Sequence, residues 1–124
     1  MQLINLGKSS SKGHYSAGVI AGNLLFVSGM LSIDLNTGVP CNGGIREHML
    51  MSLNNVKLVL DQANLALENV VQCRIYTTDV EFWNDINEIY SEFFGIHKPA
   101  RVVVPVPKLH YGCLVEIECV AEVY

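Results

Sequence analysis

The stretch Pro99-Ala100-Arg101-Val102-Val103-Val104-Pro105-Val106 decides the fold, because it is almost entirely apolar along a run of β-branched residues. Such a run bounded by proline predicts a β-strand. Successive side chains of a strand point to opposite faces, so three valines share one face while Arg101 shares the other with Val103 and Pro105. A strand that is apolar on both faces must be covered on both. The fold must therefore place a layer on each side of this strand.

The last strand is predicted over Leu114-Val115-Glu116-Ile117-Glu118-Cys119-Val120, and its two faces differ. The face predicted to lie under helices carries Val115, Ile117, Cys119, Ala121 and Val123. The opposite face carries Leu114, Glu116, Glu118, Val120 and Glu122.

Two other segments carry apolar residues at helical spacing. The first helix is predicted from Ile45 to about Asn64, with an apolar face of Met49, Leu53, Val56, Leu60 and Ala63. The second shares a face of Phe82, Ile86, Ile89 and Phe93. Thr78 or Asp79 can cap the start of this second helix, and Gly95 with Pro99 ends it.

The remaining segments predict strands and turns. After a short first strand and a polar loop from Lys8 to Gly13, Gly22-Asn23 predicts a two-residue hairpin. The segment from Asp34 to Gly44 is rich in turn residues. Alternation from Val70 to Val80 predicts another strand, with Val71, Cys73 and Ile75 against Gln72 and Arg74.

The resulting order is β-β-β-α-β-α-β-β, which predicts an α+β fold with a mixed sheet of about six strands and two helices on one face. The helices can cover only one face of the sheet. A neighbouring subunit is therefore the expected cover for the other face, and we expect Arg101 and Glu116 at or near that subunit interface.

Composition limits the class of protein. A chain of 124 residues predicts one domain, residues 1–124. A net charge of −4 without a basic cluster makes nucleic acid and anionic membranes poor partners. Charged residues make up 16% of the chain, against about 25% in an average domain, which favours self-association.

The sequence predicts a cytoplasmic protein without a bound metal. Its first residues lack a basic segment followed by a long apolar run, and no stretch is apolar enough to span a membrane. The four cysteines have no CxxC spacing, which argues against zinc. Three of them, Cys73, Cys113 and Cys119, fall in predicted strands and are interpreted as small apolar residues.

An ordered set of short motifs resembles the RidA (YjgF-type) reactive-intermediate deaminase family, over nearly the whole chain. The motifs are Gly13-His14-Tyr15-Ser16, Gly22-Asn23-Leu24-Leu25-Phe26-Val27-Ser28-Gly29, Leu53-Asn54-Asn55-Val56, Asn87-Glu88-Ile89-Tyr90 with Phe93-Phe94, Pro99-Ala100-Arg101 and Val115-Glu116-Ile117-Glu118. The resemblance implies a chorismate-mutase-like fold and a homotrimer with a ligand cleft between each pair of subunits. It also implies cofactor-independent hydrolysis of enamines and imines such as 2-aminoacrylate, 2-iminobutanoate and 2-iminopropanoate to 2-oxo acids and ammonia.

The same resemblance implies roles for individual residues. Arg101 would grip the substrate carboxylate as a bidentate fork. Glu116 would position or polarise the attacking water. Tyr15, Ser28 and Asn87 would line the pocket, and the backbone of Val103 would place a carbonyl near the amino group.

Four positions depart from the family pattern. His14 stands where the family usually has Pro, Met30 where Gln is common, Val103 where many members have Cys, and His110 where Pro is common. These positions border the expected cleft, so they bear on substrate preference more than on reaction class. His14 and His110 are also candidate general bases, although loop histidines are ordinarily just solvated.

Several alternatives stay open on sequence alone. Arg101 is also interpretable as a structural residue that forms an ion pair at the subunit interface, with Glu116 or Glu118 as its partner. The cleft would equally suit a regulatory protein that binds a small ligand without turnover, and some family members are described as translation inhibitors with ribonuclease activity. Chorismate mutase chemistry fits the fold, but a dicarboxylate substrate would want more than one cationic side chain in the cleft.

Overall fold

The computed structural model describes residues 1–7 and 13–124, so most of the predicted loop from Lys8 to Gly13 lies outside the described residues. Within the described residues, the order of strands and α-helices is the predicted one. The strands are β1 (Gln2–Ile4), β2 (Gly18–Ala21), β3 (Leu24–Leu31), β4 (Val70–Thr77), β5 (Ala100–Pro105) and β6 (Val115–Glu122). The helices are α1 (Ile45–Gln62) and α2 (Trp83–Phe94), with short 3-10 turns η1 (Leu67–Asn69), η2 (Val80–Phe82) and η3 (His110–Gly112).

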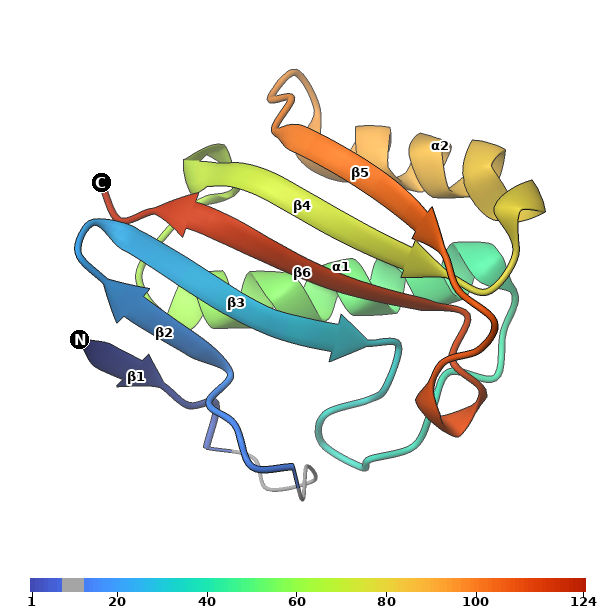
Figure 1. The fold of residues 1–124 in the computed structure, drawn as a ribbon, viewed down its shortest axis with the longest axis horizontal. Coiled ribbons are helices and arrows are strands. Elements are labelled where there is room, and N and C mark those ends of the chain that lie inside the picture. Colours follow the sequence, from blue (N-terminus) through green and yellow to red (C-terminus); the bar gives the residue numbers. More distant parts are fainter. Residues whose placement is uncertain (8–12) are drawn as a thin grey trace.

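The strands form one mixed sheet in the order β1-β2-β3-β6-β4-β5. Neighbouring strands are antiparallel except for β4 and β5, which are parallel. Parallel strands need a long crossover, and α2 supplies it between β4 and β5. Both helices lie behind the sheet in Figure 1. The predicted α+β fold with two helices on one face of a mixed sheet is therefore confirmed.

Local signals account for the ends of the elements. Gly22 has a φ of +63°, which suits the tight turn between β2 and β3, and the strands pair from Ala21 opposite Leu24. Asp79 accepts a hydrogen bond from the Glu81 N–H and so caps η2, the short turn that leads into α2. Gly95, with a φ of +66°, ends α2 as predicted.

The core lies between the helices and one face of the sheet. In β6 the predicted alternation is confirmed, because Val115, Ile117, Cys119 and Ala121 are all buried. The apolar face of α1 packs on β3 and β6 through Met49, Leu53, Val56 and Leu60, each at most 1% exposed.

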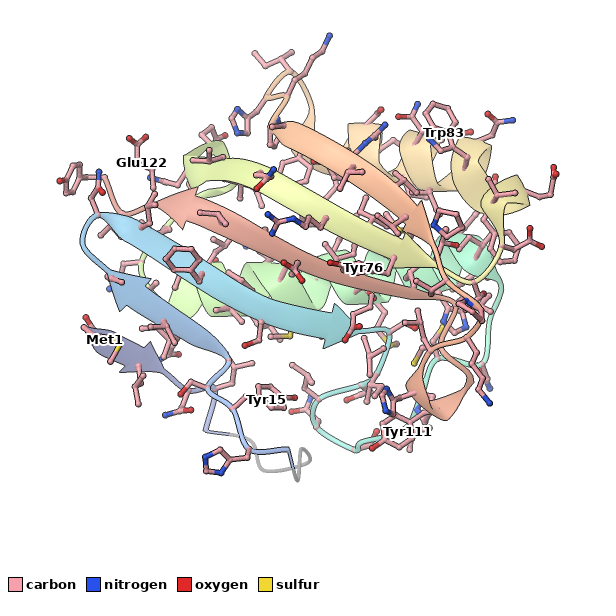
Figure 2. All side chains as sticks on the ribbon, in the orientation of Figure 1. Met1, Tyr15, Tyr76, Trp83, Tyr111 and Glu122 are labelled. Atoms are coloured by element: carbon pink, nitrogen blue, oxygen red, sulfur yellow. The ribbon has the colours of Figure 1, made fainter. Side chains whose placement is uncertain are left out.

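The other face of the sheet keeps apolar side chains in contact with solvent. Phe26 on β3 is 45% exposed and Val102 on β5 is 44% exposed. Near the middle of this face Arg74 donates to Glu118 at 2.8 Å, and Tyr76 donates to the other oxygen of Glu118 at 3.2 Å. Figure 2 shows Tyr76 on the face turned toward the viewer. This helix-free face, with Phe26, Arg74, Val102 and Glu118, is called the open face below.

The structure corrects the predicted strand from Val70 to Val80. β4 ends at Thr77, because the chain turns at Thr78 and Asp79 into η2. The register against β6 also shifts between Val70 and Gln72. As a result Val70 is buried and Val71 is exposed. The prediction had instead placed Val71 on the same face as Cys73 and Ile75, which are buried.

One cysteine also differs from its predicted place. Cys113 is buried as expected but precedes β6, at the end of η3, and does not lie in a strand. Cys73 and Cys119 lie opposite each other in β4 and β6, both buried. Among the described residues, no helix is long and apolar enough to cross a membrane.

Candidate active site

One part of the candidate site is built on an irregularity in β3. Between Val27 and Met30 the pairing of β3 with β6 shifts by one residue, so Ser28 and Gly29 form a β-bulge. Bulges re-aim side chains and are common beside active sites. The Ser28 hydroxyl donates to the Ser16 carbonyl at 2.6 Å, which ties the bulge to the segment before β2.

Gly29 lets the Glu116 carboxylate lie directly against the bulge. A Cβ on residue 29 would come within 2.8 Å of Glu116 Oε2 and 3.0 Å of its Cδ. Both contacts are shorter than nearly all real Cβ contacts. The absence of a side chain at Gly29 therefore makes room for the carboxylate that the sequence singled out.

The surroundings of Glu116 favour its protonated form. Burial raises the pKa of the Glu116 carboxyl above its ordinary value, and His110 acts in the opposite direction. The negative charge of Glu118 adds to the upward shift. A carboxylate moved toward neutrality in this way is suited to accept and return a proton.

Glu116 opens into the large cavity at one end of the sheet, of about 950 Å³. Tyr15, Ser28, Leu31, His110 and Tyr111 also line this cavity. Figure 2 shows Tyr15 and Tyr111 among the loops at this end of the sheet. The structure thus brings together three of the predicted site residues, Tyr15, Ser28 and Glu116.

The other part of the candidate site surrounds Arg101 on β5. Its guanidinium donates from Nη1 to Asn87 Oδ1 on α2 at 2.9 Å. The guanidinium carbon lies 5.0 Å from the centre of the Tyr90 ring and 5.7 Å from that of Trp83. These contacts hold the planar fork in one orientation. Arg101 and Asn87 line a second cavity of about 420 Å³.

The backbone of Val103 lies on a free strand edge. β5 is the last strand in the sheet order, and the N–H of Val106, the residue after β5, donates to the Thr77 carbonyl of β4. Backbone groups of alternate residues point to opposite sides of a strand, so those of Arg101 and Val103 point away from β4. The Val103 carbonyl is therefore placed where a ligand at this edge can reach it.

Within one chain, Arg101 and Glu116 lie on opposite faces of the sheet. Arg101 pairs in parallel register with Cys73, which is buried under the helices. Glu116 pairs with Tyr76, whose side chain belongs to the open face. The described structure therefore divides the predicted site residues into two groups, one with Arg101 and one with Glu116.

Within one chain, the described residues show no ion pair between Arg101 and a β6 carboxylate, and an ion pair across a subunit interface stays a prediction. Arg101 donates a hydrogen bond to the neutral amide of Asn87, and Glu118 accepts a hydrogen bond from Arg74. Arg101 thus keeps a charge that no carboxylate of the described residues neutralises in an ion pair.

The family departures occupy different environments. His110 and Met30 both line the cavity of Glu116. The Met30 side chain is only 5% exposed and also packs in the core. His14 is exposed. Of the three, only His110 offers a side chain that acts on Glu116.

The sequence interpretation named Asn87 but missed Trp83 and Tyr90, which also contact Arg101, and Gly29, which makes room for Glu116. Trp83, Asn87 and Tyr90 are spaced i, i+4 and i+7, so they share one face of α2 beside its apolar stripe. That spacing was a readable signal. No sequence signal pointed to Gly29, because its contact with Glu116 arises from the β-bulge in β3. In the part of the chain that is described, no group of three or more His, Cys, Asp or Glu residues is placed to hold a metal ion.

Comparison with known proteins identifies the family. The model of the family described as Endoribonuclease L-PSP matches residues 7–123. A RutC family protein from Pyrococcus horikoshii is 39% identical over 109 residues, covering 88% of this chain and 86% of that protein. Human 2-iminobutanoate/2-iminopropanoate deaminase is 33% identical over 109 residues, covering 88% of this chain and 80% of the human protein.

A solved structure with a bound ligand is also similar. The crystal structure of E. coli TdcF with bound serine superposes with a TM-score of 0.90 at 28% identity, covering 98% of each chain. The fold, the family model and the related sequences agree, and the chain belongs to the Endoribonuclease L-PSP family, which includes the RutC and RidA (YjgF-type) proteins.

Proposed function

We propose that the protein hydrolyses small 2-imino acids and their enamine tautomers, such as 2-aminoacrylate, 2-iminobutanoate and 2-iminopropanoate, to 2-oxo acids and ammonia. The observation that carries this proposal is Arg101, a guanidinium held between Asn87 and two aromatic rings without a carboxylate partner among the described residues. A fork that is already oriented and still charged suits a small carboxylate.

Glu116 supplies the proton chemistry. It takes a proton from a water as the water oxygen bonds to the imine carbon, and the C=N bond becomes a C–N single bond. Glu116 then returns this proton to the nitrogen, which gives a carbinolamine with one OH and one NH2 group. In the second step Glu116 takes the hydroxyl proton and passes it to the nitrogen, the C–N bond breaks, and ammonia leaves as the C=O bond forms. Imines hydrolyse readily, so orientation and modest acid–base help suffice.

The complete site takes Arg101 from one subunit and Glu116 from its neighbour. This arrangement follows from the opposite faces on which the two residues lie, since one chain cannot direct both at one small ligand. Phe26 and Val102 are exposed on the open face, on strands β3 and β5 that are separated by β6 and β4. A neighbouring subunit that covers this face would bury both side chains. We propose a homotrimer in which Tyr15, Ser28 and Glu116 of one subunit face Asn87, Arg101 and the Val103 carbonyl of the next.

Two relatives support this chemistry. The human relative is named for deamination of 2-iminobutanoate and 2-iminopropanoate. The structural relative TdcF holds serine, an amino acid whose carboxylate and amino groups resemble those of a 2-imino acid. Both ligands are small, and both present a carboxylate next to a nitrogen-bearing carbon.

A coupled assay tests the proposal. A threonine dehydratase generates 2-iminobutanoate in situ, and the imine is followed with and without this protein. Faster loss of the imine that disappears in Arg101→Ala and Glu116→Gln is the expected result. Arg46→Ala is a matched control, because Arg46 forms an exposed ion pair with Asp85 on the helices, away from both cavities. A folded wild-type protein that leaves the imine decay unchanged would refute the proposal.

The name of the family model points to a second candidate, ribonuclease activity. The chain carries 12 acidic and 8 basic residues, which disfavours tight binding of an RNA backbone. RNA cleavage that persists through purification and is lost in Glu116→Gln would support this candidate over the deaminase. A regulatory protein would instead bind a small 2-oxo acid at Arg101 without accelerating imine loss.

A further inference from the structure

A buried hydrogen bond links α1 to the end of β3 behind the Glu116 cavity. Ser32 Oγ and His48 Nδ1 lie 2.6 Å apart, and the two residues are 0% and 3% exposed. The backbone N–H of Leu114, just before β6, also points to His48 Nδ1 at 3.3 Å. One ring nitrogen therefore connects three segments, since Ser32 follows β3 and His48 lies in α1.

The shared contact favours one protonation state of the ring. The Leu114 backbone can only donate, so Nδ1 must carry a lone pair. The Ser32 hydroxyl is then the donor to the same nitrogen, and the ring proton of neutral His48 is on Nε2. Burial agrees with this assignment, because it lowers the pKa of His48, although the Gly43 backbone and Glu47 act in the opposite direction.

Ser32 and His48 do not form a nucleophile and base. A nucleophilic serine must be reachable by substrate, and Ser32 is fully buried. The lone pair of Nδ1, which would have to take the serine proton, is also shared with the Leu114 backbone N–H. The pair is therefore a structural connection, and it matters for the segments that it joins: α1, the end of β3 and the start of β6.

Asn55 completes the connection on the same face of α1, seven residues after His48. Its side-chain amide donates to the Leu31 carbonyl at 3.1 Å and to the Ile33 carbonyl at 2.8 Å, on either side of Ser32. Three consecutive residues after the bulge of β3 are thus bonded to α1, which runs behind β3 and β6 in Figure 1.

The residues that are held in this way surround Glu116. Leu31 is the partner of Glu116 across the strand pair, and Leu114 precedes it by two positions in the chain. Leu31 and Ile33 also line the cavity into which Glu116 opens. A shift of either strand end would move the carboxylate relative to the bulge at Gly29.

We propose that His48, in its neutral form with the proton on Nε2, acts together with Asn55 as a positioning clamp that holds the ends of β3 and β6 so that the Glu116 carboxylate stays at the bulge. The role of the clamp in turnover rests on the deaminase function proposed above. The clamp itself is a property of the fold and is testable without turnover.

Nuclear magnetic resonance tests the clamp directly. In the wild-type protein, the ¹⁵N shifts of His48 are expected to show an unprotonated Nδ1 and a protonated Nε2. The carboxyl carbon of Glu116 is expected to titrate at a higher pH than an ordinary glutamate, and this midpoint should fall in His48→Leu and in Ser32→Ala. In His48→Asn, whose Oδ1 can take the place of Nδ1, the Glu116 midpoint should return toward the wild-type value.

Kinetics give a second readout. Loss of the clamp is expected to lower kcat for 2-iminobutanoate about 10- to 100-fold, as for a small misplacement of a catalytic group. KM should change less than about twofold, because Arg101 lies on the other face and still binds the carboxylate. Ser52→Ala is the matched control, since Ser52 lies one turn further along α1, is equally buried, and its hydroxyl has no hydrogen-bond partner among the described residues.

The outcomes separate the clamp from the proposed function. An Nδ1-protonated His48, or a Glu116 titration that is identical in wild type, His48→Leu and Ser32→Ala, would overturn the clamp whatever the turnover. Wild-type kcat in folded His48→Leu and Ser32→Ala would overturn its catalytic role and leave the deaminase intact. A wild type that does not act on the imine refutes only the deaminase, while the titrations still decide the clamp.

Discussion

At the scale of single residues, the close approach of Gly29 and Glu116 gives the sharpest prediction. In Gly29→Ala the new methyl group would lie 2.8 Å from Glu116 Oε2, so the carboxylate must move. The end of a flexible side chain moves at little cost, and we expect a loss of thermal stability below about 1 kcal/mol. Activity should fall about tenfold or more, because the base leaves its position. Imine turnover and thermal unfolding check both parts.

Gly22→Ala provides the matched control with the opposite pattern. Gly22 has a φ of +63° and open space around it, so alanine there strains only the backbone. We expect a loss of about 1 kcal/mol in stability and unchanged activity. Equal losses of activity in the two variants would contradict a specific role for Gly29.

The raised pKa of Glu116 predicts the pH dependence. The base must be ionised, so kcat/KM should fall as pH drops through a midpoint above 4.5, the ordinary value for glutamate. His110 counteracts this shift, and His110→Asn should therefore move the midpoint upward. Folding stability should fall as pH rises through the same midpoint, because a carboxyl whose pKa is raised by folding favours the protonated state. Glu116→Gln should abolish that part of the stability profile.

These shifts are measured by a pH–rate profile and by denaturant unfolding across the same pH range. Glu68→Gln is a suitable control, since Glu68 lies in η1 and outside both cavities. A midpoint that moves downward in His110→Asn would contradict the assignment of His110 as the group that opposes the shift.

At the scale of the elements, α2 acts as the support for the Arg101 fork. Its face of Trp83, Asn87 and Tyr90 contacts the guanidinium by one hydrogen bond and two ring contacts. In Asn87→Ala the Arg101 guanidinium loses its hydrogen-bond partner. Binding of the substrate must then restrict more side-chain motion of Arg101, which costs conformational entropy. We expect KM for the imine to rise about tenfold with little change in kcat. Steady-state kinetics check this.

Glu88→Ala is the control for the same helix. Glu88 lies next to Asn87 but bonds to Arg46 at 3.2 Å on the exposed surface. Its removal should leave both constants unchanged. A fall in kcat at constant KM in Asn87→Ala would place Asn87 in the chemical step and not in binding.

The elements also show why part of the fold was predictable and part was not. The alternation of β6 and the face of α1 depend only on spacing along the chain, so Ile117 and Leu53 were assigned correctly. The exposure of Val71 depends on a shift against β6, which local pattern does not encode. The same holds for Gly29, whose place opposite Glu116 arises only when β3 bulges against its partner.

At the scale of the whole molecule, the relation between Arg101 and Glu116 could not be read from either strand. Parity tells which residues of one strand share a face, but not which face of β5 corresponds to which face of β6. That relation passes through β4, where Cys73 lies opposite Arg101 and Tyr76 lies opposite Glu116. Only the strand order and register of the sheet show that the two side chains lie on opposite faces. Each chain therefore carries two separate parts of the proposed site.

Two halves on one chain predict that inactive variants rescue each other. Arg101→Ala keeps a functional Glu116, and Glu116→Gln keeps a functional Arg101. In a cyclic trimer, each site takes one half from each of two neighbouring chains. After equal amounts of the two inactive variants exchange subunits at random, about a quarter of the sites should combine both intact halves and recover about a quarter of wild-type activity.

The measurement is imine turnover before and after exchange, with the assembly state followed by sedimentation. The double variant, Arg101→Ala with Glu116→Gln on one chain, mixed with either single variant, is the control. Those mixtures lack one intact half in every site and should stay inactive. If both residues instead served one site within a single chain, no mixture of the two single variants would gain activity. Recovery therefore distinguishes a shared site from one within each chain, because only a shared site can be completed by a neighbour.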